Sequence, residues 1–291
     1  MPTLRAGNLP FILLLLSLAA CAGPEVKPAS RETQPRKVAL VLGAGAAKGF
    51  AHVGVIKILE ANRVPVHMIV GTSVGSLVGS LYAYGYPAYD IQRLAMGLSK
   101  AEIADLSVPD NGFVKGEKLE AYVNRMVRGT PMEGMRIPFH AVATDIGSGQ
   151  EMVFGKGNTG AAVRASCSIP GIFRPVKIGD RTYVDGGVVS PVAVDAARRL
   201  GADAVIAVDI SGEVDGTVPD GTLDTIFQSI NIMYARIAAD QLSRADVVIR
   251  PRVGHIASGD FTRRHEAILE GEKAAQAALP KIQALLGTTS R

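Results

Sequence analysis

The amino-acid sequence predicts an α/β fold in three layers, α/β/α, with a mostly parallel central sheet that carries helices on both faces. Short, continuously apolar runs alternate along the chain with stretches whose apolar residues recur at helical spacing. Such runs are typical of parallel strands, because these strands are buried on both faces. The chain has 291 residues, of which 47% are hydrophobic, so it is long enough to bury one large core.

The first 20 residues are expected to be a signal peptide rather than part of the fold. Residues 9–20 form an apolar run that is too short for a membrane span of about 20 residues. The sequence LAAC at 18–21 resembles the lipobox of bacterial lipoproteins. That resemblance implies a lipidated Cys21 and a lipid anchor in the bacterial cell envelope, with the protein facing the periplasm from the outer membrane. The alternative is an ordinary signal peptide in which Cys21 is incidental.

Residues 21–36 are expected to be the lipidated cysteine and a flexible tether, because residues 22–36 hold three prolines and mixed charges. The folded, catalytic domain is therefore expected over residues 37–291. With Cys21 lipidated, Cys167 has no partner for an intramolecular disulfide bond.

The expected strands and helices alternate along this domain. Strands are expected at 37–42, 66–70, 139–144, 182–184, 204–208 and 246–249, and helices at 51–62, 74–84, 191–200 and 263–285. Ser190, Pro191 and Gly201 predict the ends of the third helix, as an N-cap, a first-turn proline and a glycine stop. Reactive groups of parallel sheets gather at the carboxyl ends of the strands. The residues in that position are 43–49, Ser73, Asp145, Asp185 and Asp209.

Ser73 lies in the pattern Gly71-Thr72-Ser73-Val74-Gly75, between an expected strand and an expected helix. G-x-S-x-G is typical of a nucleophile elbow, a strained turn that projects the serine hydroxyl clear of the backbone. Gly71 and Gly75 remove side chains that would collide with the neighbouring strand and helix. The simpler alternative is a tight turn with a serine cap, and five residues alone do not separate the two.

The glycine-rich loop at 43–49 admits three interpretations. A phosphate-binding loop requires Gly-Lys-Ser/Thr, but the order here is Lys48-Gly49-Phe50. A dinucleotide loop requires a third glycine at position 48 and an acidic residue at the end of the second strand, and both are missing. An oxyanion hole requires only backbone N–H groups at the start of a helix. This third interpretation alone gives the loop a reason to lie near Ser73.

A nucleophilic serine also needs a base, and the residues leave two kinds of candidate open. A Ser-Asp-His order requires a downstream histidine, for which His140, His255 and His265 are available. His52, after the glycine loop, is expected at a helix terminus instead. Three aspartates at strand ends are the other candidates, and their positions do not rank them: Asp145, Asp185 and Asp209.

Three motifs taken together resemble the patatin-like phospholipases in order and spacing: G-x-G-x-x-K-G at 43–49, G-T-S-V-G at 71–75 and D-G-G at 185–187. The stretch RASCSIPGIFRPV at 164–176 is similar to the family's segment ahead of its D-G-G motif. The resemblance covers most of residues 37–210. It implies a patatin-like fold, related to that of the α/β-hydrolases.

The resemblance also implies a Ser-Asp dyad without histidine, with Ser73 as the nucleophile and Asp185 as the proton acceptor. It implies an oxyanion hole in the loop formed by Gly45, Ala46, Ala47, Lys48 and Gly49, with supporting glycines Gly71, Gly75, Gly186 and Gly187. Many members have a glycine run in this loop, whereas Ala44 and Ala46 interrupt it here. Because alanine adopts a left-handed conformation less easily, the sequence leaves open which amides face the site.

The implied activity is that of a lipolytic serine acyl hydrolase, of phospholipase A or lysophospholipase type, that cleaves membrane lipid esters through an acyl-enzyme. The alternatives are a Ser-His-Asp carboxylesterase and a non-catalytic lipid-binding protein of the envelope. No metal or cofactor motif is visible in the sequence, and the formal charge of +4 with no basic block argues against nucleic acid. The segment 77–98 is expected either to line an acyl-chain groove or to pack ordinarily, and it includes Tyr82, Tyr84, Tyr86 and Tyr89.

Overall fold

The computed structural model describes residues 2–3, 37–106, 112–211 and 218–287. The predicted signal peptide, Cys21 and the tether lie almost wholly outside these described residues. The folded unit comprises Pro35–Arg291. In the described ranges, no helix combines the length and the apolar character that a membrane span requires.

In the described part of this unit, eight strands form one central sheet, in the order β5-β6-β3-β2-β1-β7-β8 with β4 paired to β3. The strands are β1 (Val38–Leu42), β2 (Met68–Thr72), β3 (Phe139–Asp145), β4 (Glu151–Phe154), β5 (Val176–Ile178), β6 (Arg181–Asp185), β7 (Ala204–Val208) and β8 (Val247–Ile249). The five neighbouring strands β3, β2, β1, β7 and β8 run parallel to one another, whereas β4, β5 and β6 pair antiparallel. The sheet is thus mixed but mostly parallel, as expected.

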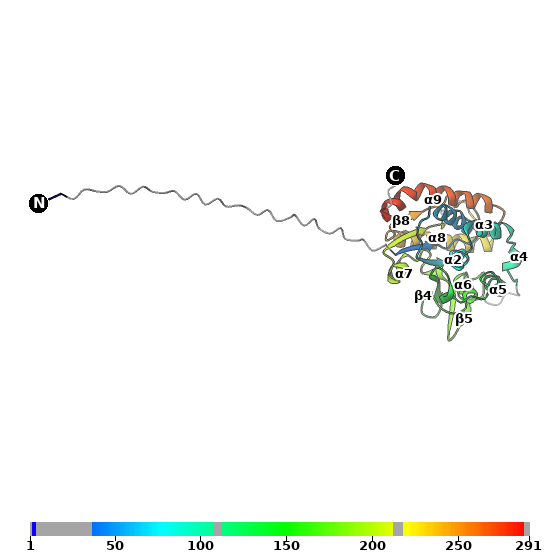
Figure 1. Ribbon diagram of the computed structural model, residues 1–291. Helices are drawn as coiled ribbons and strands as arrows, with labels where there is room; N and C mark the ends of the chain where they lie inside the picture. The colour runs from blue at the N-terminus through cyan, green and yellow to red at the C-terminus, as the bar shows by residue number, and fades with distance from the viewer. Residues whose placement is uncertain (1, 4–36, 107–111, 212–217, 288–291) are drawn as a thin grey trace. The chain divides into compact units, whose positions relative to one another are not determined.

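Helices cover both faces of the sheet. They are α1 (Phe50–Ala61), α2 (Val74–Tyr84), α3 (Ala88–Gly97), α4 (Lys100–Ile103), α5 (Glu117–Met126), α6 (Thr159–Ser166), α7 (Val194–Arg199), α8 (Thr222–Leu242) and α9 (Arg264–Leu286), with 3-10 turns at η1 (Ala46–Gly49), η2 (Met132–Gly134) and η3 (Gly186–Val188). Alternate residues of β1 enter two different cores: Leu40 joins residues of α1 and α9, and Val41 joins residues of α7 and α8. Figure 1 shows α9 and α7 on opposite sides of the strands. The predicted three-layer architecture is confirmed.

Close packing of α1 against α9 depends on two glycines. A Cβ atom added at Gly54 of α1 would lie 1.9 Å from the Ile268 carbonyl oxygen, and one added at Gly271 of α9 would lie 2.0 Å from that of Ala51. The two helix backbones are therefore in direct contact. Since α1 begins directly after η1, this contact also fixes the glycine-rich loop against the rest of the fold.

The predicted start of the helix at 191–200, with Ser190 as its N-cap and Pro191 in its first turn, is wrong. The helix α7 begins only at Val194, and its N-cap residue is Ala193. The Ser190 carbonyl accepts a hydrogen bond from Thr72 Oγ1 at 2.9 Å, and the Val192 N–H donates to Gln241 Oε1 at 3.1 Å. These tertiary contacts hold residues 190–192 in an irregular segment, which local helix signals do not foresee.

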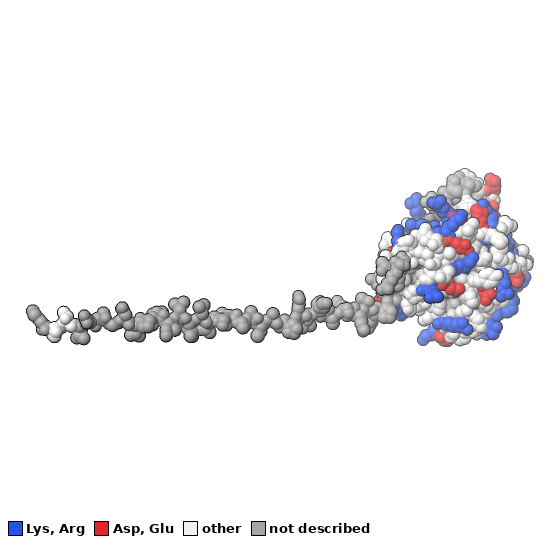
Figure 2. All heavy atoms as spheres, turned by 45° about the horizontal axis from the view of Figure 1, so that its top comes forward, with Lys and Arg blue, Asp and Glu red and all other residues white. Residues whose placement is uncertain are grey.

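Charged side chains on the face drawn in Figure 2 are of both signs and are interspersed with uncharged surface. This distribution agrees with the small formal charge of +4. The visible face therefore offers no broad field of one sign to a polyanionic partner.

Candidate active site

Ser73 occupies the abrupt junction between β2, which ends at Thr72, and α2, which begins at Val74. Its backbone angles, φ 55° and ψ −129°, are rare for a residue with a side chain. Its N–H donates to Ser166 Oγ at 2.9 Å, and its carbonyl accepts from Ser76 Oγ at 2.7 Å. The surrounding contacts thus hold the strained turn in place.

The two glycines around Ser73 are required by close backbone approach. A Cβ atom at Gly71 would lie 2.5 Å from Ser76 Cα, and one at Gly75 would lie 2.1 Å from the Leu42 carbonyl oxygen. Strand β1, strand β2 and helix α2 therefore meet at this turn with no room for side chains. This is the geometry of a nucleophile elbow rather than of an ordinary capped turn.

Asp185 lies at the end of β6 and faces Ser73. Ser73 Oγ donates to Asp185 Oδ2 at 2.5 Å, and the Gly187 N–H donates to Oδ1 at 2.7 Å. The aspartate is completely buried, and this burial raises its pKa to about 6, against the opposing effects of the hydrogen bonds from Ser73 and Gly187 and of the nearby Tyr234 hydroxyl. The carboxylate is thus a stronger base than an exposed aspartate.

The glycines after Asp185 are explained by two different neighbours. A Cβ atom at Gly186 would lie 2.1 Å from the Val142 carbonyl oxygen. One at Gly187 would lie 2.2 Å from Cζ of Tyr234, on α8. The D-G-G motif therefore lets β3 approach from one side and an aromatic ring from the other.

The glycine-rich loop forms η1 beside Ser73. The amides of Ala44, Ala47 and Lys48 donate within the protein, to the carbonyls of Pro191, Ser258 and Gly45 at 2.9, 3.1 and 3.1 Å. Within the described ranges, the amides of Gly45 and Ala46 have no acceptor. Of residues 45–48, Gly45 and Ala46 thus have amides that remain open to an oxyanion, while Gly49 is the last residue of η1.

The structure also shows the conformation of Ala46 and the position of the Lys48 side chain. Ala46 does adopt a left-handed conformation, with φ 49°, despite its Cβ atom. The Lys48 side chain is buried, and its Nζ donates to the Ser211 carbonyl at 2.9 Å. Lys48 therefore fastens the loop to the segment after β7.

The other two strand-end aspartates are engaged elsewhere. Asp145 Oδ1 accepts the Gly147 N–H at 2.9 Å, and Oδ2 lies 3.4 Å from Arg181. Asp209 accepts from Ser211 at 2.7 Å and pairs with Arg250 at 3.2 Å. Both aspartates stabilise turns, and only Asp185 meets Ser73.

No hydrogen bond joins Ser73 or Asp185 to a histidine in the part of the chain that the structure describes. His52 is buried against the Gly43 carbonyl at 2.8 Å, and burial lowers its pKa to about 4. His255 pairs with Glu266 at 2.7 Å near the surface. His140 is flanked by Gly155, and His265 is exposed on the first turn of α9. The geometry thus gives a Ser-His-Asp triad no support.

An apolar cavity of about 310 Å³ opens beside Ser73. Its wall includes Ala46 and Gly49 of the loop, and side chains from α1, α2, α3 and α5. From the segment 77–98 it takes Leu77, Val78, Leu81, Ile91, Ala95 and Leu98. The four tyrosines of that segment do not line it; Tyr86, for example, donates to the Met126 carbonyl at 2.9 Å. The segment 77–98 therefore lines an apolar cavity through its aliphatic residues, and the expectation that its tyrosines take part is wrong.

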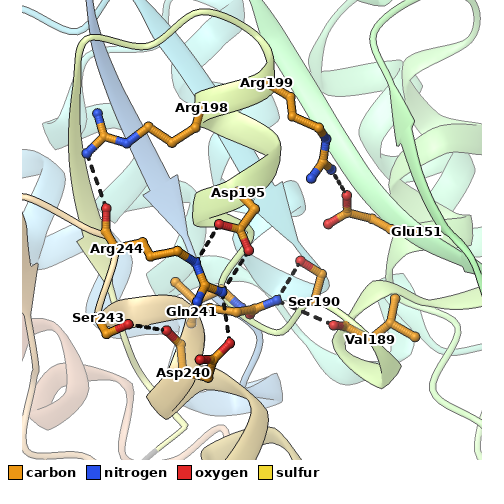
Figure 3. A network of polar contacts seen from close by, with 11 residues as sticks. Glu151, Val189, Ser190, Asp195, Arg198, Arg199, Asp240, Gln241, Ser243 and Arg244 are labelled. Atoms are coloured by element: carbon orange, nitrogen blue, oxygen red, sulfur yellow. Dashed lines mark hydrogen bonds and ion pairs between the residues drawn. The ribbon is translucent and has the colours of Figure 1, made fainter.

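A polar network joins the segment around Val189 and Ser190 to α8 (Figure 3). Gln241 Nε2 donates to Ser190 Oγ at 3.2 Å and to the Val189 carbonyl at 3.4 Å. Arg244 bridges Asp195 of α7 at 2.6 Å and Asp240 of α8 at 2.9 Å. These contacts anchor the residues that follow the D-G-G motif.

Sequence reasoning missed two residues at this site, Ser166 and Tyr234. Ser166 lies in the quoted stretch 164–176, so that stretch contained a signal for it. Tyr234 lies in a helix that the sequence analysis did not predict, and nothing in its local sequence points to Asp185.

Comparisons with known proteins identify the family of this chain. A family model for the patatin-like phospholipases matches residues 40–198. An uncharacterised NTE family protein of Mycobacterium tuberculosis is 32% identical over 212 residues, which are 72% of this chain and 59% of that protein. Lysophospholipase NTE1 of Coccidioides immitis is 32% identical over 197 residues, which are 66% of this chain and 12% of that protein. This chain thus spans less than two thirds of either relative's length.

Among solved structures, VipD from Legionella pneumophila matches with a TM-score of 0.60 at 14% identity, over 85% of this chain and 67% of that one. A likeness at such low identity concerns the fold alone. The family model, in contrast, covers more than half of the 291 residues and all three motifs. The chain belongs to the patatin-like phospholipase family.

Proposed function

We propose that this protein is a serine acyl hydrolase that cleaves acyl esters of membrane lipids through a Ser73–Asp185 dyad. The observation that carries the proposal is the 2.5 Å hydrogen bond from Ser73 Oγ to a buried carboxylate, beside an apolar cavity. A nucleophile, a base and a place for an acyl chain are thus in one location.

In the first step, Asp185 accepts the Ser73 proton as Oγ attacks the ester carbonyl carbon. The amides of Gly45 and Ala46 hold the developing oxyanion, an interaction worth about 3 kcal/mol per donor in acyl transfer. The leaving alcohol takes the proton from Asp185, and the acyl group remains on Ser73. In the second step, Asp185 accepts a proton from water as the water oxygen attacks the acyl-enzyme carbonyl carbon. The fatty acid leaves, and Asp185 returns the proton to Ser73 Oγ, which restores the starting state.

The substrate class we propose is a phospholipid or lysophospholipid. The cavity is lined by aliphatic and aromatic side chains, which suit a single acyl chain. The fungal relative bears the name lysophospholipase, which supports the same class. A lysophospholipid, with one chain, is therefore the substrate to test first.

Attachment to the envelope through a lipidated Cys21 is part of the proposal. Its support is the lipobox-like LAAC at 18–21 and the apolar run before it. Metabolic labelling with a fatty acid is then expected to modify the wild-type full chain and not Cys21→Ser. Equal labelling of both would contradict the anchor.

Labelling with a fluorophosphonate probe, combined with turnover of lysophosphatidylcholine, tests the dyad. We expect the wild type to be labelled and active, Ser73→Ala to lose both, and Asp185→Asn to lose most of the turnover. His255→Ala is the matched control and is expected to stay active. Labelling that persists without Ser73 would contradict the proposal, as would loss of activity in His255→Ala, which the Ser-His-Asp alternative predicts.

A further inference from the structure

The hydroxyl of Tyr234 is a buried polar group without a hydrogen bond. Tyr234 lies on α8 and is 4% exposed. Its Oη has no hydrogen-bond partner within the described ranges. Buried hydroxyls are nearly always paired, so an unpaired one next to a reactive centre points to a functional interaction.

The Tyr234 ring lies against the amide that holds Asp185. A Cβ atom at Gly187 would lie 2.2 Å from Tyr234 Cζ and 2.5 Å from its Oη. The N–H of the same Gly187 donates to Asp185 Oδ1 at 2.7 Å. The phenolic oxygen is therefore close enough to Asp185 for each group to affect the pKa of the other, although no hydrogen bond joins them in this conformation. Gly187 is not among the glycines with a positive φ, so glycine is needed there to leave room for the Tyr234 ring and not for its backbone conformation.

Two other titratable groups face Asp185 in the part of the chain that the structure describes, Tyr234 from α8 and Cys167 after α6. Burial, followed by the charge of Asp185, raises the pKa of the Tyr234 phenol well above its usual value. The same two causes raise the pKa of the Cys167 thiol. Both groups are therefore neutral in the working pH range, and the phenol has a hydrogen to donate.

We propose that Tyr234 is a positioning residue, which donates its phenolic hydrogen to the Asp185 carboxylate, holds it toward Ser73 and favours its ionised form. The inference rests on the proposed function of Ser73 and Asp185. Tyr234 keeps its proton throughout, and the proton of Ser73 still moves to Asp185. A small movement of α8 or of the carboxylate completes the bond in the free enzyme, whose ionisation kcat/KM reports.

The test is the pH dependence of Tyr234→Phe, which keeps the ring and removes one oxygen. We expect the acid inflection of kcat/KM for lysophosphatidylcholine to move to higher pH by about one unit, because a donor to the ionised carboxylate is lost. The rate of fluorophosphonate labelling is expected to show the same movement. Tyr86→Phe, whose hydroxyl donates to the Met126 carbonyl, is the matched control and is expected to keep the wild-type inflection. An unchanged inflection in Tyr234→Phe overturns the inference.

Two further variants test the inference, and the first of them does not depend on the folding of Tyr234→Phe. Gly187→Ala places a methyl group against the ring, so it is expected to displace the hydroxyl and move the inflection in the same direction. In an Asp185→Asn background, Tyr234→Phe is expected to leave the residual labelling rate unchanged. A further fall in that rate would show that Tyr234 acts independently of Asp185 and would overturn the inference. Full activity of Asp185→Asn alone would instead contradict the proposed function itself.

Discussion

At the scale of single residues, Asp185 is a buried carboxylate whose ionisation opposes folding. Its pKa is raised from 3.8 to about 6 by burial, so the folded state binds its proton more tightly than the unfolded state does. Stability from this group is therefore present at low pH and is lost as the pH rises from 3.8 to about 6. The loss amounts to about 3 kcal/mol above that window.

Asp185→Asn is accordingly expected to be more stable than the wild type at pH 8, by up to about 3 kcal/mol, and to show little gain at pH 4. Urea unfolding at the two pH values measures the difference. Asp145→Asn is the contrasting control, because the hydrogen bond from the Gly147 amide lowers the pKa of Asp145. That variant is expected to lose stability at pH 8. Equal effects of Asp185→Asn at both pH values would contradict the assignment of a raised pKa.

Ser73 also lowers the stability of the fold, because its backbone has a positive φ of 55°. A Cβ atom in this conformation costs about 1–2 kcal/mol, whereas glycine tolerates it. Glycine also loses more entropy on folding, by about 0.4–1 kcal/mol. Ser73→Gly is therefore expected to be more stable than Ser73→Ala by about 1 kcal/mol in urea unfolding, although both variants lack the hydroxyl. Ala46→Gly, at φ 49°, is likewise expected to be more stable than the wild type in urea unfolding, because glycine relieves the same strain. A less stable Ser73→Gly would show that the turn is not strained.

At the scale of secondary-structure elements, the contact between α1 and α9 positions the glycine-rich loop. Gly54→Ala would place a methyl group 1.9 Å from the Ile268 carbonyl oxygen, so the two helices have to separate. We expect a loss of about 3 kcal/mol in the free energy of unfolding, at the upper end for overpacking. Gly97→Ala, which meets nothing within 4 Å, is the control and is expected to be neutral or stabilising. A Gly54→Ala variant as stable as this control would contradict the close helix contact.

The elements also differ in how well the sequence predicts them. The buried strands β1, β2, β3 and β7 follow from continuous apolar runs, since neither face of a central parallel strand meets water. The start of α7 does not follow from its local signals. Thr72 and Gln241, which lie far away in the sequence, bind the segment that Ser190 and Pro191 were expected to begin. Tertiary contacts override capping preferences there.

At the scale of the whole molecule, the cavity beside Ser73 is assembled from helices of several parts of the chain. Ala104 lines it and is partly exposed, so a larger side chain there narrows the cavity with little disturbance of the core. Ala104→Trp is expected to lower turnover of palmitoyl lysophosphatidylcholine at least tenfold relative to turnover of a short acetyl ester. The ratio of the two rates is the measurement, with Leu106→Trp, at an 82% exposed position, as the control. An unchanged ratio in Ala104→Trp would show that the acyl chain binds elsewhere.

The nucleophile elbow and the fold class follow from local sequence. A G-x-S-x-G turn between a buried strand and a helix requires only short-range sterics, which the five residues around Ser73 already contain. The base is different, because Asp145, Asp185 and Asp209 share the same local setting at strand ends. Ser73 and Asp185 are 112 positions apart, and their 2.5 Å hydrogen bond exists because β6 pairs antiparallel to β3. The resemblance to a family indicated Asp185, but physical reasoning from the residues alone left three aspartates equal.

The open amides of the loop, the wall of the cavity and the place of Tyr234 depend still more on the packed molecule. Ala47 and Ala46 look alike in the sequence, yet only the Ala47 amide reaches the Ser258 carbonyl. Tyr234 meets Gly187 because α8 packs against η3, and no periodicity along the chain encodes such packing. Local sterics and hydrophobic spacing thus account for the strands and the reactive turn. Long-range packing selects which carboxylate, which amides and which hydroxyl surround it, because only packing brings distant residues within hydrogen-bond distance.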